Sequence, residues 1–257
     1  MTPESLAEAG LRLSVDGAVA TVTLDRPEVR NAQTPAMWHA LRDLAGEIPA
    51  GVRVVVLRGS GHSFSAGLDR AMLDPATGDV ARLLQLDDAA VSAAIDEYQQ
   101  GFTWLRDPRF VTIAAVQGYA IGAGFQLALS CDLRVVTDDA QFCMKESALG
   151  LVPDLTGTKP LVEAVGYARA LEICATARMV GAAEAVDIGL ALTAVPADQL
   201  DSTVADLVAA LTAPLAGAVS ETKRLLLTAA ATDLDQQRRL EREAQARRFR
   251  ELAALMG

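Results

Sequence analysis

The segment Val116-Gln-Gly118-Tyr-Ala-Ile-Gly122-Ala-Gly124-Phe-Gln-Leu-Ala-Leu-Ser-Cys-Asp132-Leu133 decides the fold of this chain. The apolar run 111–116 that leads into it predicts a buried strand, and the apolar residues 125–129 behind its glycines predict a helix. Glycines at a strand-to-helix junction let the backbone approach a ligand closely. The first N–H groups of the helix lack partners, and its dipole favours negative charge there. The pattern therefore favours an oxyanion hole or an anion site; the alternative is that small residues only allow tight helix packing.

The segments on the N-terminal side predict three strands and one helix. The alternating runs 11–15 and 19–24 flank a glycine-containing turn and predict a β-hairpin. Thr34 and Pro35 supply a cap and a first-turn proline for a helix that ends near residue 48. The run 52–57 is too apolar for an edge strand, so we expect a central parallel strand.

The segments on the C-terminal side alternate between strands and helices and then become helical throughout. Residues 74–79 are rich in Pro, Gly and Asp and predict a surface loop. After Pro196 the chain is helical, with breaks near Pro214 and Thr232. The fold class is therefore α/β, with ββα units in a core domain over 1–196 and a helical region over 197–257. Further strands are expected at 133–136, 140–144 and 191–195, and further helices at 87–105, 158–165, 167–177 and 182–189.

Composition excludes several classes of protein. With 257 residues, of which 51% are apolar, the chain is long enough to bury a full core. Its formal net charge of −10 argues against nucleic acid as the main partner. The three cysteines and two histidines lack the spacing of metal ligands or of a catalytic triad, so we expect no metal site. No apolar run reaches membrane-spanning length and no basic signal-peptide start is present, which predicts a cytoplasmic protein without a membrane span.

Four stretches together resemble the enoyl-CoA hydratase/isomerase (crotonase) family. They are Arg26-Pro27-x-x-x-Asn31-Ala32, Phe64-Ser65-Ala66-Gly67-Leu68-Asp69, Gly118-Tyr119-Ala120-Ile121-Gly122-Ala123-Gly124, and Ala140-Gln141-Phe142 with Glu146. The resemblance runs from about Leu11 to about Val195. It implies a spiral of ββα units, a C-terminal helical trimerisation region, and a homotrimer or a dimer of trimers. It also implies an acyl-CoA thioester as substrate and no cofactor beyond the coenzyme A that the substrate carries.

The resemblance assigns the oxyanion hole to the backbone N–H groups of Leu68 and Ala123. Removing a proton alpha to a thioester places negative charge on its carbonyl oxygen, and two fixed donors stabilise that charge more than the ground state. Because the donors belong to the main chain, both side chains can vary. By the same resemblance we expect substrate contacts at Glu28, Arg30, Ala32, Ser65, Ala66, Gly67, Asp69, Tyr119, Gly122, Gln126 and Pro153.

Glu146 and Asp154 are the candidate catalytic residues. Hydratases of the family use two glutamates; the second matches Glu146, but Gln126 occupies the place of the first. An amide cannot exchange a proton near neutral pH. Asp154 matches a functional aspartate of the dienoyl-CoA isomerases and the chlorobenzoyl-CoA dehalogenases, although a loop or helix-cap aspartate is an equal alternative.

These residues imply double-bond isomerisation of an enoyl-CoA with Glu146 as the proton shuttle. The alternatives are hydratase activity despite Gln126 and a non-catalytic acyl-CoA-binding protein. An apolar acyl pocket is expected to raise the pKa of Glu146. Lys145 directly precedes it, and an ion pair between the two would instead lower that pKa.

Overall fold

Two β-sheets form the framework of the protein, and the computed structural model describes residues 1–256. The larger sheet has six strands in the order β1-β2-β3-β4-β6-β9. Only β1 is antiparallel to its neighbour, and every other pair in this sheet is parallel. The strands are β1 Leu11–Asp16, β2 Val19–Leu24, β3 Val54–Gly59, β4 Val111–Val116, β6 Leu133–Thr137 and β9 Thr193–Val195.

The expected hairpin and central strand are both present. β1 and β2 pair from Leu11 with Leu24 to Asp16 with Val19, and Gly17 makes the turn with a φ of +54°. β3 lies between β2 and β4 and is parallel to both. Its apolar side chains are buried on both faces of the sheet, which is why the run lacks the alternation of a half-exposed strand.

A second, smaller sheet was not expected from the sequence. It consists of β5 (Tyr119–Ile121), β7 (Gln141–Cys143) and β8 (Val180–Gly181). An isolated bridge between Ser65 and Ala120 places the segment around Ser65 beside β5. Strands of two or three residues are too short to show a period of two in the sequence. The sequence therefore predicted only β7, as part of the expected strand 140–144, and neither β5 nor β8.

Helices cover both faces of the large sheet. On one face, α2 (Pro35–Glu47), α4 (Asp88–Thr103) and α5 (Ala123–Ser130) bury the main apolar core, in which Trp38 packs at 5.0 Å from the ring of Tyr98. On the other face, α9 (Leu200–Thr212) packs against apolar side chains of β3, β4 and β6. The remaining helices are α1 Pro3–Glu8, α3 Asp79–Leu83, α6 Thr158–Val165, α7 Tyr167–Thr176, α8 Ala182–Asp187, α10 Ala216–Ala229 and α11 Leu234–Met256.

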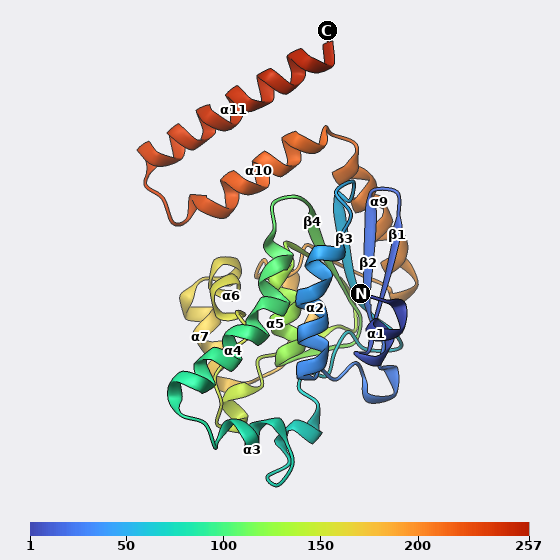
Figure 1. Cartoon of the computed structure of the whole chain (residues 1–257), viewed down its shortest axis with the longest axis vertical. Helices are drawn as coiled ribbons and strands as arrows, with labels where there is room; N and C mark the ends of the chain where they lie inside the picture. Colours follow the sequence, from blue (N-terminus) through green and yellow to red (C-terminus); the bar gives the residue numbers. More distant parts are fainter. Residues whose placement is uncertain (257) are drawn as a thin grey trace.

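The C-terminal helices α10 and α11 lie side by side at one end of the molecule, away from the sheet (Figure 1). The breaks expected near Pro214 and Thr232 separate α9, α10 and α11. Lys223 of α10 anchors the pair by an ion pair of 2.7 Å with Asp132, and its ammonium also donates to the carbonyl of Phe110. The domain boundary at residue 196 stays a prediction, and Gly257 at the end of that region lies outside the described residues.

Two helices fall outside the expectations. α1 follows Thr2, whose hydroxyl caps it, and α3 begins at Asp79, inside the segment expected to be a loop. Within residues 1–256, no single helix is long and apolar enough to cross a membrane; the segments 197–212 and 216–229 pass together on length and composition, but they are bent by 100°.

Candidate active site

The structure brings the two predicted oxyanion segments against each other. The segment around Ser65 runs along β5, with the Ser65 N–H donating to the Tyr119 carbonyl (2.9 Å) and the Ile121 N–H donating to the Ser65 carbonyl (3.0 Å). Gly67 follows with a φ of +87° and lies so close to Ile121 that a Cβ would overlap its carbonyl oxygen. The Leu68 and Ala123 amides are therefore near neighbours, although they are 55 positions apart in the sequence.

The Ala123 N–H opens α5. Gly122 precedes it with a φ of +51°, and the Gly122 N–H donates to the Cys143 carbonyl of β7 (2.8 Å). Neither Leu68 nor Ala123 donates its N–H to another group in the part of the chain that the structure describes. Two free donors, one of them at the start of a helix, suit an atom that develops negative charge.

The Glu146 carboxylate lies against the same glycine. A Cβ on Gly122 would be 3.3 Å from Glu146 Oε1. Glu146 starts the 3₁₀ turn Glu146–Leu149 after β7 and is only 8% exposed. Burial raises the pKa of Glu146 above its ordinary value, and the negative charge of Asp154 adds to the rise, while hydrogen bonds from its own backbone and from Gln126 oppose it.

Gln126 is the direct neighbour of Glu146. Its Nε2 donates to Glu146 Oε1 (2.7 Å), in a contact buried from solvent. Its Oε1 accepts from the N–H groups of Leu155 (2.9 Å) and Gly157 (3.2 Å). The other oxygen of Glu146, Oε2, is buried and has no hydrogen-bond partner within residues 1–256.

Asp154 lies on the loop that this amide holds. It is half-buried, its carbonyl oxygen accepts from Gln99 Nε2 (2.6 Å), and burial raises its pKa. The ion pair considered for Lys145 is wrong, because that side chain is exposed and the pKa of Glu146 is raised. The surroundings of the carboxylate come from Gln126 of α5 and, through that amide, from the 153–157 loop.

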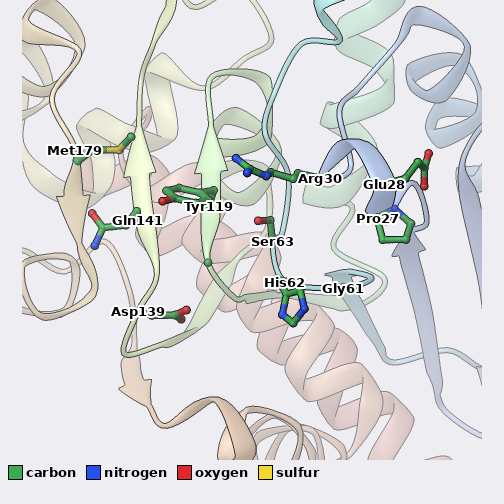
Figure 2. Close-up of a pocket in the computed structure, with 11 residues that line it drawn as sticks. Pro27, Glu28, Arg30, Gly61, His62, Ser63, Tyr119, Asp139, Gln141 and Met179 are labelled. Carbon is green, nitrogen blue, oxygen red and sulfur yellow. The ribbon is translucent and has the colours of Figure 1, made fainter.

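A cavity of about 870 Å³ adjoins the N-terminal end of β5 (Figure 2). The guanidinium of Arg30 lies over the ring of Tyr119 at 6.0 Å, and Glu28 is on the same rim. Three predicted substrate residues thus line one cavity, while Glu146 lies beyond the other end of β5. The remaining lining residues are Pro27, Gly61, His62, Ser63, Gly118, Asp139, Gln141 and Met179.

Other predicted contact residues use their side chains within the protein. The Ser65 hydroxyl donates to the Asn31 carbonyl and accepts from the Gly67 N–H (2.8 and 3.2 Å). Asp69 pairs with Arg26 at 2.9 Å. Ala32 is buried, and its carbonyl oxygen accepts from Arg26. Ala66 and Pro153 are half-buried, so their direct contact with a ligand stays a prediction.

Sequence reasoning quoted Asn31 as part of a motif without assigning it a role, and it missed Gln33; both side chains hold these loops. Asn31 is fully buried, and its Nδ2 donates to the carbonyls of Ser60 and Ser63 (2.9 and 2.8 Å). Gln33 accepts from Trp38 Nε1 (2.8 Å) and donates to the Ser65 hydroxyl. The signal available in the sequence was a pair of amide side chains, Asn31 and Gln33, close to glycine-containing loops. In the described part of the chain, no three His, Cys, Asp or Glu side chains gather as metal ligands would.

The fold and the site define an α/β enzyme in which a buried carboxylate, that of Glu146, lies beside Gly122 at the start of a short helix. The enoyl-CoA hydratase/isomerase family matches residues 14–257, and the chain belongs to this family. Its crotonase-like fold, expected from the four motifs, is confirmed by the solved structures that it resembles.

Two solved structures are similar over nearly the whole chain. A "putative enoyl-CoA hydratase" of Thermobifida fusca YX in complex with acetoacetyl-CoA is 51% identical, with a TM-score of 0.92 over 97% of this chain and 98% of that one. The same protein in complex with CoA gives a TM-score of 0.93 over 99% and 98%. Among sequence relatives, a "Probable enoyl-CoA hydratase" of Rhodobacter capsulatus is 36% identical over 72% of this chain and 68% of its own length. The "Putative enoyl-CoA hydratase/isomerase YhaR" of Bacillus subtilis is 32% identical over 92% and 89%.

Proposed function

We propose that the protein isomerises the double bond of an enoyl-CoA thioester. The thioester oxygen accepts from the N–H groups of Leu68 and Ala123, and the helix that begins at Ala123 adds a favourable dipole. The observation that carries the proposal is the Glu146 carboxylate beside Gly122, one residue from the Ala123 donor. Each such donor typically contributes about 10²–10³ in rate.

Glu146 moves the proton. It takes a proton from the alpha carbon of a 3-enoyl-CoA, whose electrons then spread over the dienolate and the thioester oxygen. It returns the same proton to the gamma carbon, so that the double bond migrates to the 2-position and the carboxylate is regenerated. A pKa raised by burial brings the carboxylate nearer to the working pH, which suits a general base.

Gln126 favours isomerisation over water addition. Water addition needs, besides the group that protonates the alpha carbon, a second group that takes a proton from the water attacking the beta carbon, and the amide of Gln126 cannot act as that base. Its oxygen and one of its N–H groups are also already hydrogen-bonded within the protein. Asp154, with a pKa also raised by burial, is the auxiliary acid or base.

Hydratase activity is the second candidate, because the Rhodobacter and Thermobifida relatives carry that name. In that case Asp154 would have to supply the second proton-transfer group. The two candidates differ in their product: a 3-hydroxyacyl-CoA contains one added water, whereas an isomer has the mass of its substrate.

The polar end of coenzyme A is assigned to the cavity at β5. Tyr119 lines this cavity and lies three residues before Gly122, which corresponds to about 10 Å along a strand. A flexible acyl-CoA arm can span that length. Arg30 offers a guanidinium for the phosphates, and Tyr119 offers a ring face. The complexes of the Thermobifida protein with CoA and acetoacetyl-CoA support this class of ligand.

The test is incubation with 3-enoyl-, 2-enoyl- and dienoyl-CoA, followed by absorbance and mass. Conversion of the 3-enoyl to the 2-enoyl ester without a change of mass supports isomerisation. Rapid hydration of crotonyl-CoA would overturn it in favour of a hydratase. Binding of every ester without turnover would leave an acyl-CoA carrier.

A further inference from the structure

We propose that Gln126 is a positioning residue that gives the two oxygens of Glu146 different tasks. Oε1 is held as a hydrogen-bond acceptor, and Oε2 is the oxygen that carries the transferred proton. This inference rests on the proposed function in one respect: Glu146 must be the proton carrier. It adds which oxygen acts and which neighbour decides this.

The orientation of the Gln126 amide follows from its donors. Leu155 and Gly157 present backbone N–H groups, which only donate, so the amide oxygen must face them. The amide nitrogen then faces Glu146, and the 2.7 Å contact can form only with this nitrogen as the donor. A flipped amide would set N–H against N–H at one end and oxygen against carboxylate at the other.

Gly157 shows that this place is built for the glutamine. A Cβ on Gly157 would lie 2.6 Å from Gln126 Cγ, so any larger residue would push the side chain away. Gln126 itself is fully buried, and water does not compete for its hydrogen bonds. The amide is thus fixed from the loop side before it meets the carboxylate.

The consequence for Glu146 is an asymmetric carboxyl group. A protonated Oε1 would be a much weaker acceptor for the N–H of Gln126, so the protonated form carries its hydrogen on Oε2. Oε2 is buried and accepts no hydrogen bond among the described residues, so it is the oxygen whose lone pairs no protein group uses. The donated hydrogen bond also stabilises the charged form and limits the rise in pKa that burial causes.

The alternative is a purely structural role, in which Gln126 only fills the core between α5 and the 153–157 loop. Gln126→Leu removes the donor and keeps a side chain of similar size. Gln126→Glu keeps an acceptor for Leu155 and Gly157 and supplies an O–H donor while the pair of carboxyl groups holds one shared proton. Gln99→Leu is the matched control, because Gln99 holds the same loop through the Asp154 carbonyl.

Two measurements distinguish a positioning role of Gln126 from a purely structural one. The first is the pH dependence of the rate at which the alpha protons of butyryl-CoA exchange for deuterium in D₂O, followed by proton NMR. The second is the pKa of Glu146 from carbon NMR of the protein labelled at the glutamate carboxyl carbons, assigned with Glu146→Gln; this measurement needs no turnover.

For Gln126→Leu we expect the exchange rate to fall about 10- to 100-fold, the typical worth of a hydrogen bond to a charged group, with little change in KM. The acid limb of the profile and the NMR pKa both move to higher pH. Gln126→Glu should retain exchange at low pH and lose it as the shared proton leaves, an alkaline limb that the parent lacks. Gln99→Leu should leave the pKa of Glu146 unchanged.

An unchanged pKa of Glu146 in Gln126→Leu would overturn the proposal, whatever the variant's melting temperature. If that variant does not fold, Gln126→Glu provides the test: a pH profile identical to that of the parent would contradict the proposal. If the parent binds acyl-CoA but exchanges no proton, the proposed function fails. The positioning role is then still judged by whether the NMR pKa rises in the variant.

Discussion

The backbone of Gly67 lies so close to Ile121 that a Cβ on Gly67 would overlap the Ile121 carbonyl oxygen and lie 3.5 Å from the Ala123 nitrogen. This contact holds two loops from distant parts of the sequence in register. It fixes the spacing of the Leu68 and Ala123 amides, because neither segment can move away without breaking the hydrogen bonds of Ser65 with β5.

Gly67→Ala should therefore lower turnover more than it lowers stability. The added methyl group separates the two loops, and a side chain is strained at a φ of +87°. We expect kcat to fall about 10²- to 10³-fold, as when one oxyanion donor is lost. Steady-state kinetics measure this, with Leu68→Ala as the control that keeps the backbone N–H. Equal losses in the two variants would show that the side chain of Leu68 and not the backbone matters.

Glu146→Gln should abolish isomerisation and raise stability at neutral pH. The folded-state pKa of Glu146 lies above its ordinary 4.5, so between these two values the native state binds more protons than the unfolded state. The free energy of unfolding of the parent contains a term that decreases as pH rises through this window. The variant lacks this term. Urea unfolding at pH 5 and pH 8 should therefore show that the variant exceeds the parent in free energy of unfolding by more at pH 8 than at pH 5. A gain that is equal at both pH values contradicts the raised pKa.

Asp154→Asn should move the acid limb of the rate profile to lower pH. The charge of Asp154 contributes to the raised pKa of Glu146, and removing it lets the glutamate ionise earlier. We also expect a smaller loss on mono-enoyl than on dienoyl substrates, because the auxiliary group matters more where the proton travels further. Asp16→Asn in the β1–β2 hairpin is the charge-matched control. An acid limb at the same pH as in the parent would mean that Asp154 does not influence the pKa of Glu146.

Lys223→Met should cost about 3–5 kcal/mol of unfolding free energy, the usual result of leaving one member of a buried ion pair alone. Lys223 is 8% exposed and joins α10 to Asp132 at 2.7 Å. The matched control is Arg247→Met, which removes the pair with Glu221 on a more exposed surface and should cost at most about 1 kcal/mol. Denaturant titration compares the two, and similar losses would show that burial of Lys223 is not decisive.

The protein should sediment as a trimer or a dimer of trimers. Leu226, Phe249 and Leu255 on α10 and α11 are 70%, 63% and 66% exposed, and such apolar surface is normally covered in an assembly. Analytical ultracentrifugation at micromolar concentration measures the mass directly. Leu226→Lys should weaken the assembly, whereas a monomer in the parent protein would refute the expectation.

The sequence by itself determined most of the elements and pointed to the candidate site. Periodic apolar residues placed the hairpin and the helices after residue 158, because one-sided burial imprints a period of two or 3.6 on the sequence. A continuous apolar run placed β3, because a central strand is buried on both faces. Glycines at 67, 122 and 124 marked the loops, since only glycine adopts positive φ there without strain or allows such close approach. The family resemblance then supplied Glu146 as the acidic residue to examine.

Only the tertiary structure decided how these parts meet. Gln126 and Glu146 are 20 residues apart, and Lys223 and Asp132 are 91 apart; no local pattern encodes either contact. The second sheet, made from strands too short for periodicity, brings the Ser65 segment, β5 and β7 together. The pKa of Glu146 depends on the burial that results, which is why the sequence left open whether Lys145 would lower it. Distance through space and exclusion of water set the chemistry of a carboxylate, and both arise only when the chain has folded.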